Sequence, residues 1–268
     1  MSADTPQPAD SRSDVLAIIP ARYASTRLPG KPLVMLAGKT MIERVWERVA
    51  LAHSVTRAVV ATDDERVLSA VRAFGGEAVM TRATHRSGTE RAAEVAAGPL
   101  GRDGIQFVVN VQGDEPLLDP AGIDAAIEAL DADSEVGVST LAVPIGVASE
   151  IMDPNVVKTV LDFEDRALYF SRAPIPWVRD REGLAHARHL KHLGLYAFRR
   201  ETLLEFPTLP AGVLERLEQL EQLRWLENGY SIRVVETPND SVSVDVPEDV
   251  GRVEALLVAG GGTQEPHP

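Results

Sequence analysis

Apolar positions in the first half of the chain recur at two spacings, one typical of strands and one of helices. Short β-branched runs predict buried strands at residues 15–19, 58–62, 78–80 and 107–111. Between them, apolar residues three and four positions apart predict helices at residues 41–49, 67–74, 89–97 and 120–130. Thr40 and Thr89 are the expected N-caps of two of these helices. The alternation indicates an α/β fold, an open and mostly parallel doubly wound sheet covered on both faces.

The second half of the chain has a less regular pattern. Strands are predicted at residues 136–143, 156–161, 193–198 and 232–236. Leucines recur at near-helical spacing from Leu214 to Leu226, a stripe typical of a core or of a subunit interface. No repeat or linker divides the halves, so we expect one domain over residues 14–258. Polar, Pro-rich or Gly-rich stretches at 1–13 and 259–268 are expected to be disordered tails.

The composition limits the classes of partner and of chemistry. With 27 Lys and Arg against 40 Asp and Glu, the net charge is −13, which argues against nucleic acid as a partner. The chain has no cysteine, which excludes disulfides, thiol catalysis and cysteine-bound zinc. No apolar run approaches the ~20 residues of a membrane span, and residues 1–13 lack the apolar core of a secretory signal. We therefore expect a cytoplasmic protein without membrane insertion.

A basic loop follows the first predicted strand, at residues 20–32 (PARYASTRLPGKP). It carries Arg22, Arg27 and Lys31 and no acidic residue, although the whole chain is acidic. Its two later prolines and its glycine prevent a helix. Such a loop suits a polyphosphate, because backbone N–H groups, Arg and Lys can all face phosphate oxygens. The plainer alternative is a solvated surface loop; neither a Walker A motif nor a GxGxxG motif is present.

Two carboxylates are candidates for a magnesium site. Asp114 directly follows the predicted strand at 107–111, and ligands of open parallel sheets bind at the carboxyl ends of strands. Mg²⁺ commonly takes one or two carboxylates together with phosphate oxygens. Asp245 stands two residues before Pro247, so its residue pattern alone favours an ordinary helix cap. Asp114 has a similar alternative as a cap or turn residue.

Segments over most of the chain resemble one family, the 3-deoxy-manno-octulosonate cytidylyltransferases, or CMP-Kdo synthetases. The segments are PARYASTRLPGKPL from residue 20, VVATDDERV at 59–67, MTRATHRSGTERAAEV at 80–95, NVQGDEPLL at 110–118, TLAVPI at 140–145, ALYFSRAPIPW at 167–177, HLGLYAFR at 192–199, LEQLEQLRWLENG at 217–229 and VDVPEDV at 244–250. The resemblance covers roughly residues 14–258 and implies the nucleotide-diphospho-sugar transferase type of sheet. It also implies an irregular portion used for dimerisation and sugar binding.

The resemblance implies three groups of site residues. The nucleotide is expected to contact Arg22, Ser25, Arg27, Lys31, Arg82, Ser87 and Gly88. The acidic sugar is expected to be surrounded by Gln112, Arg172, His192, Tyr196, Glu221 and Gln222. Mg²⁺, the expected cofactor, would be held by Asp114 and Asp245, which form the catalytic set together with Arg22 and Lys31.

Several of these assignments have a plainer structural alternative. Arg82, Ser87 and Gly88 fit a turn with a solvated arginine. His192 enters an apolar strand and fits a hydrogen-bonded core histidine, and Arg172 fits a surface cation. The carboxylate of an α-keto acid sugar, however, needs an arginine-type partner and several polar donors.

The chain departs from the family at a few positions. Lys191 stands where the family often has arginine, which keeps the charge but loses the bidentate fork. Val246 stands where threonine is usual, and residues 241–243 (SVS) stand where the family is Gly-rich. Asp245 is kept, but the geometry of its loop is left open by these differences.

The expected function is Mg²⁺-dependent transfer of CMP from CTP to the anomeric hydroxyl of 3-deoxy-D-manno-octulosonate, with release of pyrophosphate, for lipopolysaccharide synthesis. Residues 14–130 would mainly bind the nucleotide, and residues 131–258 would mainly bind the sugar and a second copy in a homodimer. One alternative is a cytidylyltransferase for another acidic sugar, such as an amino-substituted octulosonate or a sialic-acid-like compound. A non-catalytic nucleotide-binding paralogue is a third possibility, against which Lys31, Asp114 and Asp245 weigh.

Overall fold

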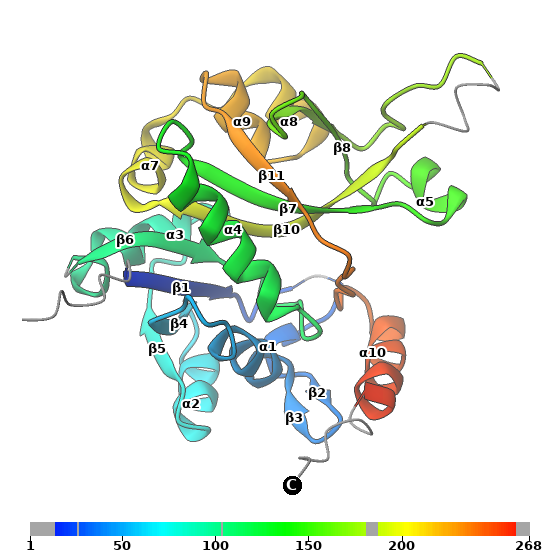
Figure 1. Cartoon of the computed structure of the whole chain (residues 1–268). Helices are drawn as coiled ribbons and strands as arrows, with labels where there is room; N and C mark the ends of the chain where they lie inside the picture. Colours follow the sequence, from blue (N-terminus) through cyan, green and yellow to red (C-terminus); the bar gives the residue numbers. More distant parts are fainter. Residues whose placement is uncertain (1–13, 26, 103, 181–186, 261–268) are drawn as a thin grey trace, which may run out of the picture.

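One mixed sheet organises the part of the chain that the computed structural model describes, residues 14–25, 27–102, 104–180 and 187–260 (Figure 1). Its main strands, in spatial order, are β11 (Ile232–Glu236), β7 (Val138–Pro144), β10 (Leu190–Arg199), β6 (Ile105–Asn110), β1 (Asp14–Ala21), β4 (Arg57–Thr62) and β5 (Glu77–Met80). Two hairpins complete the strands: β8 (Lys158–Leu161) with β9 (Ala167–Ser171), joined to β10, and β2 (Met35–Leu36) with β3 (Lys39–Thr40). The predicted α/β sheet is confirmed.

The direction of β10 sets where the two halves of the chain meet. β10 runs antiparallel to both β6 and β7, whereas the pairs β1–β4, β1–β6, β4–β5 and β7–β11 are parallel. Tyr196 on β10 lies opposite Asn110, the last residue of β6. The amino-terminal half of β10 therefore extends past the carboxyl end of β6, at the edge of the sheet where ligands of parallel strands bind.

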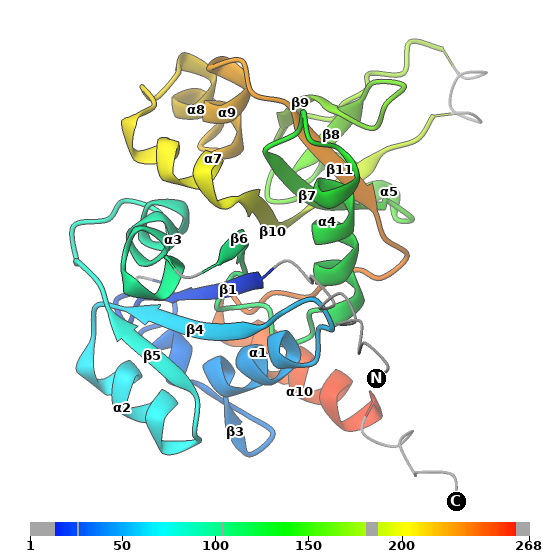
Figure 2. The ribbon, with the colours of Figure 1, turned by 60° about the vertical axis from the view of Figure 1, so that its left-hand side comes forward.

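Helices cover both faces of the sheet, as expected (Figures 1 and 2). One face holds α1 (Met41–Ala50), α2 (Glu65–Ala73) and α4 (Pro120–Ala132), whose buried residues join the core that includes β1. The other face holds α3 (Gly88–Ala97), α7 (Arg200–Glu205) and α9 (Gln222–Glu227). α5 (Ala148–Met152) and α8 (Val213–Glu218) are short helices of the second half. Three 3₁₀ turns are η1 (Lys31–Leu33), η2 (Pro99–Gly101) and η3 (Phe206–Thr208).

A small apolar cluster fastens the last helix, α10 (Pro247–Gly260), to the first half of the chain. It joins Val253 of α10 and Val244 before it to Leu28, Leu36 and Met41. α10 includes residues 259 and 260, the start of the expected C-terminal tail; the remaining tail residues lie outside the described part. No helix in the described part is both long enough and apolar enough to cross a membrane.

Two helix predictions differ from the structure. α3 begins at Gly88 because Ser87, not Thr89, is its N-cap and accepts a hydrogen bond from the backbone N of Glu90. The leucine stripe does not form one helix, because Gln219 is left-handed (φ 55°) and separates α8 from α9. Leu217 is consequently 76% exposed, whereas Leu223 is fully buried.

Strand boundaries differ less. β10 starts at Leu190, three residues before the predicted start, and β7 spans Val138–Pro144. β9 was not predicted, because its short apolar segment precedes Pro174 and Pro176 and is also compatible with a loop. Thr40 caps α1 as predicted, accepting from the backbone N of Glu43.

Candidate active site

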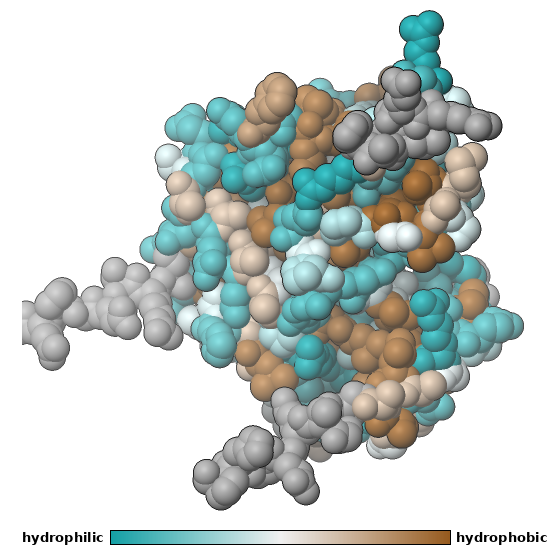
Figure 3. All heavy atoms as spheres, turned by 45° about the vertical axis from the view of Figure 1, so that its right-hand side comes forward, coloured by the Kyte–Doolittle hydropathy of each residue, from teal (hydrophilic) through white to brown (hydrophobic). Residues whose placement is uncertain are grey.

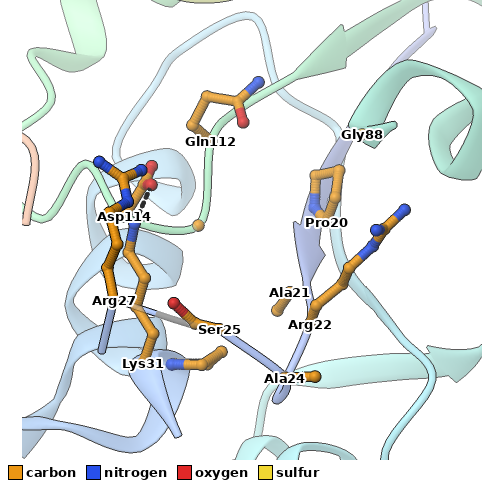
Figure 4. A pocket seen from close by; sticks show the side chains of 12 residues that line it. Pro20, Ala21, Arg22, Ala24, Ser25, Arg27, Lys31, Gly88, Gln112 and Asp114 are labelled. Atoms are coloured by element: carbon orange, nitrogen blue, oxygen red, sulfur yellow. Dashed lines mark hydrogen bonds and ion pairs between the residues drawn. The ribbon is translucent and has the colours of Figure 1, made fainter. Parts of the chain in front are cut away.

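A cavity of about 390 Å³ opens at the carboxyl ends of β1 and β6 (Figure 4). It is lined by Pro20, Ala21, Arg22, Ala24, Ser25, Arg27, Lys31, Pro32, Gly88, Gln112, Gly113 and Asp114. β1 and β6 are parallel neighbours, so the segments that follow them emerge on the same side of the sheet. The basic loop and Asp114 therefore face one space, as predicted from their positions after two strands.

The basic loop is folded back on itself by local contacts. Gly30 adopts a left-handed conformation (φ 68°), and its backbone N donates to the main-chain oxygen of Tyr23 at 3.2 Å. η1 then begins at Lys31, and the prolines on either side limit the backbone there. The Tyr23 ring is covered by the guanidinium of Arg66, 3.4 Å from the ring centroid. The loop thus presents Lys31 from a short, fixed turn rather than from a free segment.

The Lys31 ammonium bridges the two candidate metal carboxylates. Its Nζ donates to Oδ2 of Asp114 and, at 2.9 Å, to Oδ1 of Asp245. Figure 4 shows Lys31, Arg27 and Asp114 gathered on one side of the cavity. Burial lowers the pKa of Lys31, but the two carboxylates outweigh burial, so the pKa lies above its ordinary value. The ammonium is therefore charged at neutral pH.

The Asp245 side chain is held by cations and does not cap the helix that follows. Its Oδ1 also accepts from Nη2 of Arg27 at 2.9 Å. The backbone N–H groups of Asp245 and Val246 instead donate to Oδ2 of Asp249, at 2.9 and 3.0 Å. Asp249 is the third residue of α10 and reaches back, as the inner member of a capping box does. The capping interpretation of Asp245 is therefore not supported by its contacts.

Arg22 and Arg82 lie apart from the carboxylates. Arg22 points to the other side of the cavity (Figure 4), where its Nη2 donates to the main-chain oxygen of His85. Arg82 lies outside this cavity, and its Nε contacts Oε2 of Glu94 at 3.3 Å. His85 contacts the same carboxylate through Nε2. Arg22 is thus placed in the cavity, whereas Arg82 borders a neighbouring one.

The predicted sugar residues on β10 stand next to the segment after β6. A Cβ added to Gly194 would lie 3.3 Å from Cγ of Gln112, so glycine allows the close approach of the two segments. Nε2 of His192 lies 2.9 Å from Oγ1 of Thr140, and the rings of His192 and Tyr196 are 5.4 Å apart. Burial lowers the pKa of His192 to about 3 and raises the pKa of Tyr196 well above its usual value. Both side chains are therefore neutral at pH 7.

Glu221 and Gln222 stand at the start of α9. Burial raises the pKa of Glu221, while hydrogen bonds from Thr89 and Ser87 act in the opposite direction. The Glu221 carboxylate thus joins α9 to the amino-terminal end of α3, next to Gly88 of the cavity. Gln222 is buried beside it.

Arg172 is engaged by main-chain oxygens. Its Nε donates to the oxygen of Glu218 at 2.8 Å, and its Nη1 donates to the oxygen of Pro154 at 2.9 Å. Its backbone N donates to Oε2 of Glu218 at 2.9 Å. The guanidinium therefore links the end of α8, the end of β9 and the segment after α5, and it does not line the cavity.

Two residues near the cavity, Asn110 and Glu115, were not singled out from the sequence. Asn110 is fully buried at the end of β6, and neither amide atom has a partner among the described residues. Glu115 follows Asp114 and accepts a hydrogen bond from Oγ of Ser241. Glu115 belongs to the NVQGDEPLL segment, but a carboxylate in a sequence can be either a metal ligand or a structural hydrogen-bond acceptor, and the sequence does not distinguish the two.

The carboxylates fit a magnesium ion that shares its ligands with a nucleotide. Within the described residues, no group of three or more His, Cys, Asp or Glu side chains is placed to hold a metal. Asp114 and Asp245 nevertheless converge on one cation, Lys31. Two carboxylates plus phosphate oxygens and water are the usual magnesium environment in nucleotide sites.

Comparisons with known proteins agree with one another. A family model described as cytidylyltransferase matches residues 16–233. A 3-deoxy-manno-octulosonate cytidylyltransferase from Solibacter usitatus is 53% identical over 245 residues, 91% of this chain and 95% of the relative. The enzyme of that description from Syntrophotalea carbinolica is 54% identical over 249 residues, 91% of this chain and 98% of its own.

Two solved structures are similar as well. A CMP:2-keto-3-deoxy-manno-octonic acid synthetase in complex with CTP superposes with a TM-score of 0.86 at 42% identity, over 92% of this chain and 100% of its own. The 4-diphosphocytidyl-2C-methyl-D-erythritol synthase of Anaerococcus prevotii gives a TM-score of 0.61 at 12% identity, over 92% of this chain and 96% of its own, a likeness of fold alone.

Proposed function

The chain belongs to the 3-deoxy-manno-octulosonate cytidylyltransferases, and from that premise we propose that the cavity at the ends of β1 and β6 is where it transfers CMP from CTP to the sugar. The single observation that carries this placement is the convergence of Lys31, Asp114 and Asp245, which come from three distant parts of the chain. It brings phosphate-binding and metal-binding groups to the same edge of the sheet.

In the proposed reaction, the anomeric hydroxyl of 3-deoxy-D-manno-octulosonate attacks the α-phosphorus of CTP. The new bond joins the anomeric oxygen to phosphorus, the hydroxyl proton is released, and the bond from the α-phosphorus to the bridging oxygen breaks as pyrophosphate leaves. Arg22, Arg27 and Lys31 hold and neutralise the triphosphate, which is the main task of a protein in such transfers. Asp114 and Asp245 would hold Mg²⁺, which would supply charge neutralisation and polarisation of the phosphate.

The nucleotide is proposed to extend from Lys31 toward the start of α3. Ser25 and Gly88 line the cavity, and Ser87 caps α3 beside Gly88. The amino-terminal end of a helix offers free N–H groups to polar ligand atoms. Arg82 is the least supported member of this group, because Glu94 holds its side chain outside the cavity.

The sugar is proposed to lie between the segment after β6 and the start of β10. Gln112, His192 and Tyr196 are brought together there, and Glu221 with Gln222 approaches from α9. Because His192 and Tyr196 are neutral, they act as hydrogen-bonding groups and not as charge partners. Arg172 can serve the sugar carboxylate only after releasing some of its main-chain acceptors.

Pyrophosphate release tests the function directly. With purified protein, CTP and Mg²⁺, we expect release that depends on 3-deoxy-D-manno-octulosonate. Preference for an amino-substituted octulosonate or a sialic-acid-like sugar would move the assignment to the alternative acidic sugars. If none of these sugars supports pyrophosphate release although CTP still binds, the result would favour the non-catalytic paralogue.

The protein is also proposed to be a homodimer. Large apolar side chains are exposed on α5, β9 and α8, among them Met152, Leu168 and Leu217, at 66%, 62% and 76% exposure. On the face drawn in Figure 3, apolar side chains are interspersed with polar ones. Light scattering is expected to give twice the chain mass at micromolar concentration; a monomer mass would refute the dimer.

A further inference from the structure

An irregular strap, residues 237–246, carries Asp245 from the far edge of the sheet to the cavity. The strap leaves β11 and ends where α10 begins (Figure 1). Its early part is fastened by two polar contacts. Nδ2 of Asn239 donates to Oδ2 of Asp119 at 2.6 Å, and Nζ of Lys191 donates to Oδ2 of Asp240 at 2.7 Å. The strap is neither helix nor strand, so such contacts help to set where Asp245 lies, together with the bonds that Asp245 itself makes to Lys31 and Arg27.

Two further contacts to the strap, at Ser241 and Val244, are made by Asp114 and its neighbour Glu115. The main-chain oxygen of Asp114 accepts from the backbone N of Val244 at 2.9 Å. The Glu115 carboxylate accepts from Oγ of Ser241. The same dipeptide therefore supplies one metal carboxylate and the two acceptors that fix the strap carrying the other.

The Glu115 carboxylate is engaged by the strap through its hydrogen bond from Ser241. Lys191 and Asp240 are the charged side chains that act on it besides Asp114. No group of three acidic or histidine side chains forms a metal site in the described residues, so Glu115 does not gather with Asp114 and Asp245. Glu115 is therefore placed to orient the segment that carries Asp245, and not to bind the metal itself.

We propose that Glu115 and Ser241 are positioning residues, whose hydrogen bond sets the separation of the Asp114 and Asp245 carboxylates. This inference rests on the proposed function of the two aspartates. Groups that orient metal ligands commonly change metal affinity by 10–100-fold when removed.

The first test compares Ser241→Ala with Ser241→Thr and with Ser243→Ala, a serine on the same strap. Mg²⁺ binding to the protein saturated with CTP, without sugar, is measured by calorimetry, alongside the Mg²⁺ concentration that gives half-maximal turnover. We expect Ser241→Ala to raise the dissociation constant for Mg²⁺ and the half-maximal Mg²⁺ concentration by about 10-fold each. Ser241→Thr should restore most of the lost affinity, and Ser243→Ala should match the wild type. Equal Mg²⁺ affinity in Ser241→Ala and wild type would overturn the proposal.

The second test separates positioning from direct ligation. Glu115→Gln keeps an oxygen that can accept from Ser241, so Mg²⁺ affinity is expected to fall about 3-fold or less, while Glu115→Ala should match Ser241→Ala at about 10-fold. A severe loss in Glu115→Gln with a normal Ser241→Ala would identify Glu115 as a ligand and refute the proposal.

Folding and the premise are checked separately. Melting temperatures and Mg²⁺-free CTP binding near wild-type values would show that these variants fold. The effect of Glu115→Ala is expected to be absent when Asp245 is already Asn, and additive losses in that double variant would also refute the proposal. If the wild-type protein releases no pyrophosphate, the proposed function is wrong. The calorimetric Mg²⁺ measurements do not need turnover, so the two failures can be told apart.

Discussion

At the scale of single residues, the site is a balance of two carboxylates and two cations. Lys31 and Arg27 neutralise Asp114 and Asp245 in the described contacts. Lys31 is the more buried of the two cations, with 14% of its side chain exposed against 64% for Arg27. A buried cation in a low-dielectric position acts more strongly on a phosphate than an exposed one.

Lys31→Ala is expected to lower kcat by roughly 10²–10³, the scale for losing one preorganised charge-stabilising donor. The fold should persist, because the core does not include this side chain. Lys39→Ala is the matched control: that lysine pairs with Glu47 away from the cavity, and its removal should leave kcat near normal. Steady-state kinetics with far-UV dichroism decides, and an unchanged rate in a folded Lys31→Ala variant would remove the phosphate role.

Asp245→Asn is expected to lower the rate steeply while changing the melting temperature little. The amide keeps the shape of the side chain but loses the negative charge that faces Lys31 and the metal. Added Mn²⁺, which binds such mixed ligands more tightly than Mg²⁺, should recover part of the rate. A normal kcat for this variant at limiting Mg²⁺ would end the role of Asp245 as a metal ligand.

His192 predicts how stability depends on pH. Its folded-state pKa is lowered to about 3, whereas an unfolded histidine titrates near 6.5. Between these values only the unfolded chain binds the extra proton, so stability is complete above about pH 6.5 and is lost as the pH falls toward 3. The slope contributed is at most about 1.4 kcal/mol per pH unit.

Melting temperatures at pH 7 and pH 5 measure this effect. His192→Gln should reduce the loss on acidification relative to the wild type. His53→Gln is the control, because 96% of the His53 side chain is exposed. An identical pH dependence in wild type and His192→Gln would show that His192 is not the responsible group.

At the scale of elements, helix starts carry both stability and function. Thr40 caps α1 and Ser87 caps α3 through the same kind of bond to the backbone N three residues on. Both follow the spacing of a capping box, although the residue pattern predicts Thr89 as the cap of α3. Ser87, Gly88 and Thr89 are all short and polar or flexible, so the pattern alone left the first residue of α3 ambiguous by two positions.

Replacing the two caps separates these contributions. Thr40→Ala and Ser87→Ala are each expected to cost ~1 kcal/mol of stability. Only Ser87→Ala should also raise the KM for CTP, because the start of α3 borders the cavity. Denaturant unfolding and CTP kinetics on both variants test this, and parallel kinetic behaviour of the two would place the nucleotide elsewhere.

The leucine stripe shows where periodicity fails as a guide. Spacing alone indicated one continuous apolar face, but a left-handed residue, Gln219, is not visible in a hydrophobic pattern. Leu217 and Leu223 therefore reach opposite environments although they are six residues apart. The strands of the first half were predicted more closely, because parallel strands buried on both faces are unbroken apolar runs.

At the scale of the whole molecule, the meeting of residues that follow two parallel strands could be predicted from the sequence. Ion pairs with a segment far along the chain could not. Lys31 and Asp114 follow two strands, and their meeting could be expected from a parallel sheet. The ion pair of Arg27 with Asp245 joins residues 218 positions apart, and no local pattern indicates it. Only the resemblance to a family pointed to Asp245, whereas the contacts of Glu115 with the strap needed the structure.

The distance along the chain between Lys31 and Asp245, 214 positions, has a consequence for synthesis on the ribosome. The basic loop is among the first segments to leave the exit tunnel, and the strap is among the last. A nascent chain that has formed most of its sheet therefore still lacks Asp245, the second of the two carboxylates proposed to hold the metal. Because a chain emerges from its amino terminus at ~5–20 residues per second, the proposed metal site would be complete only after more than 200 further residues, and an unfinished chain would lack it.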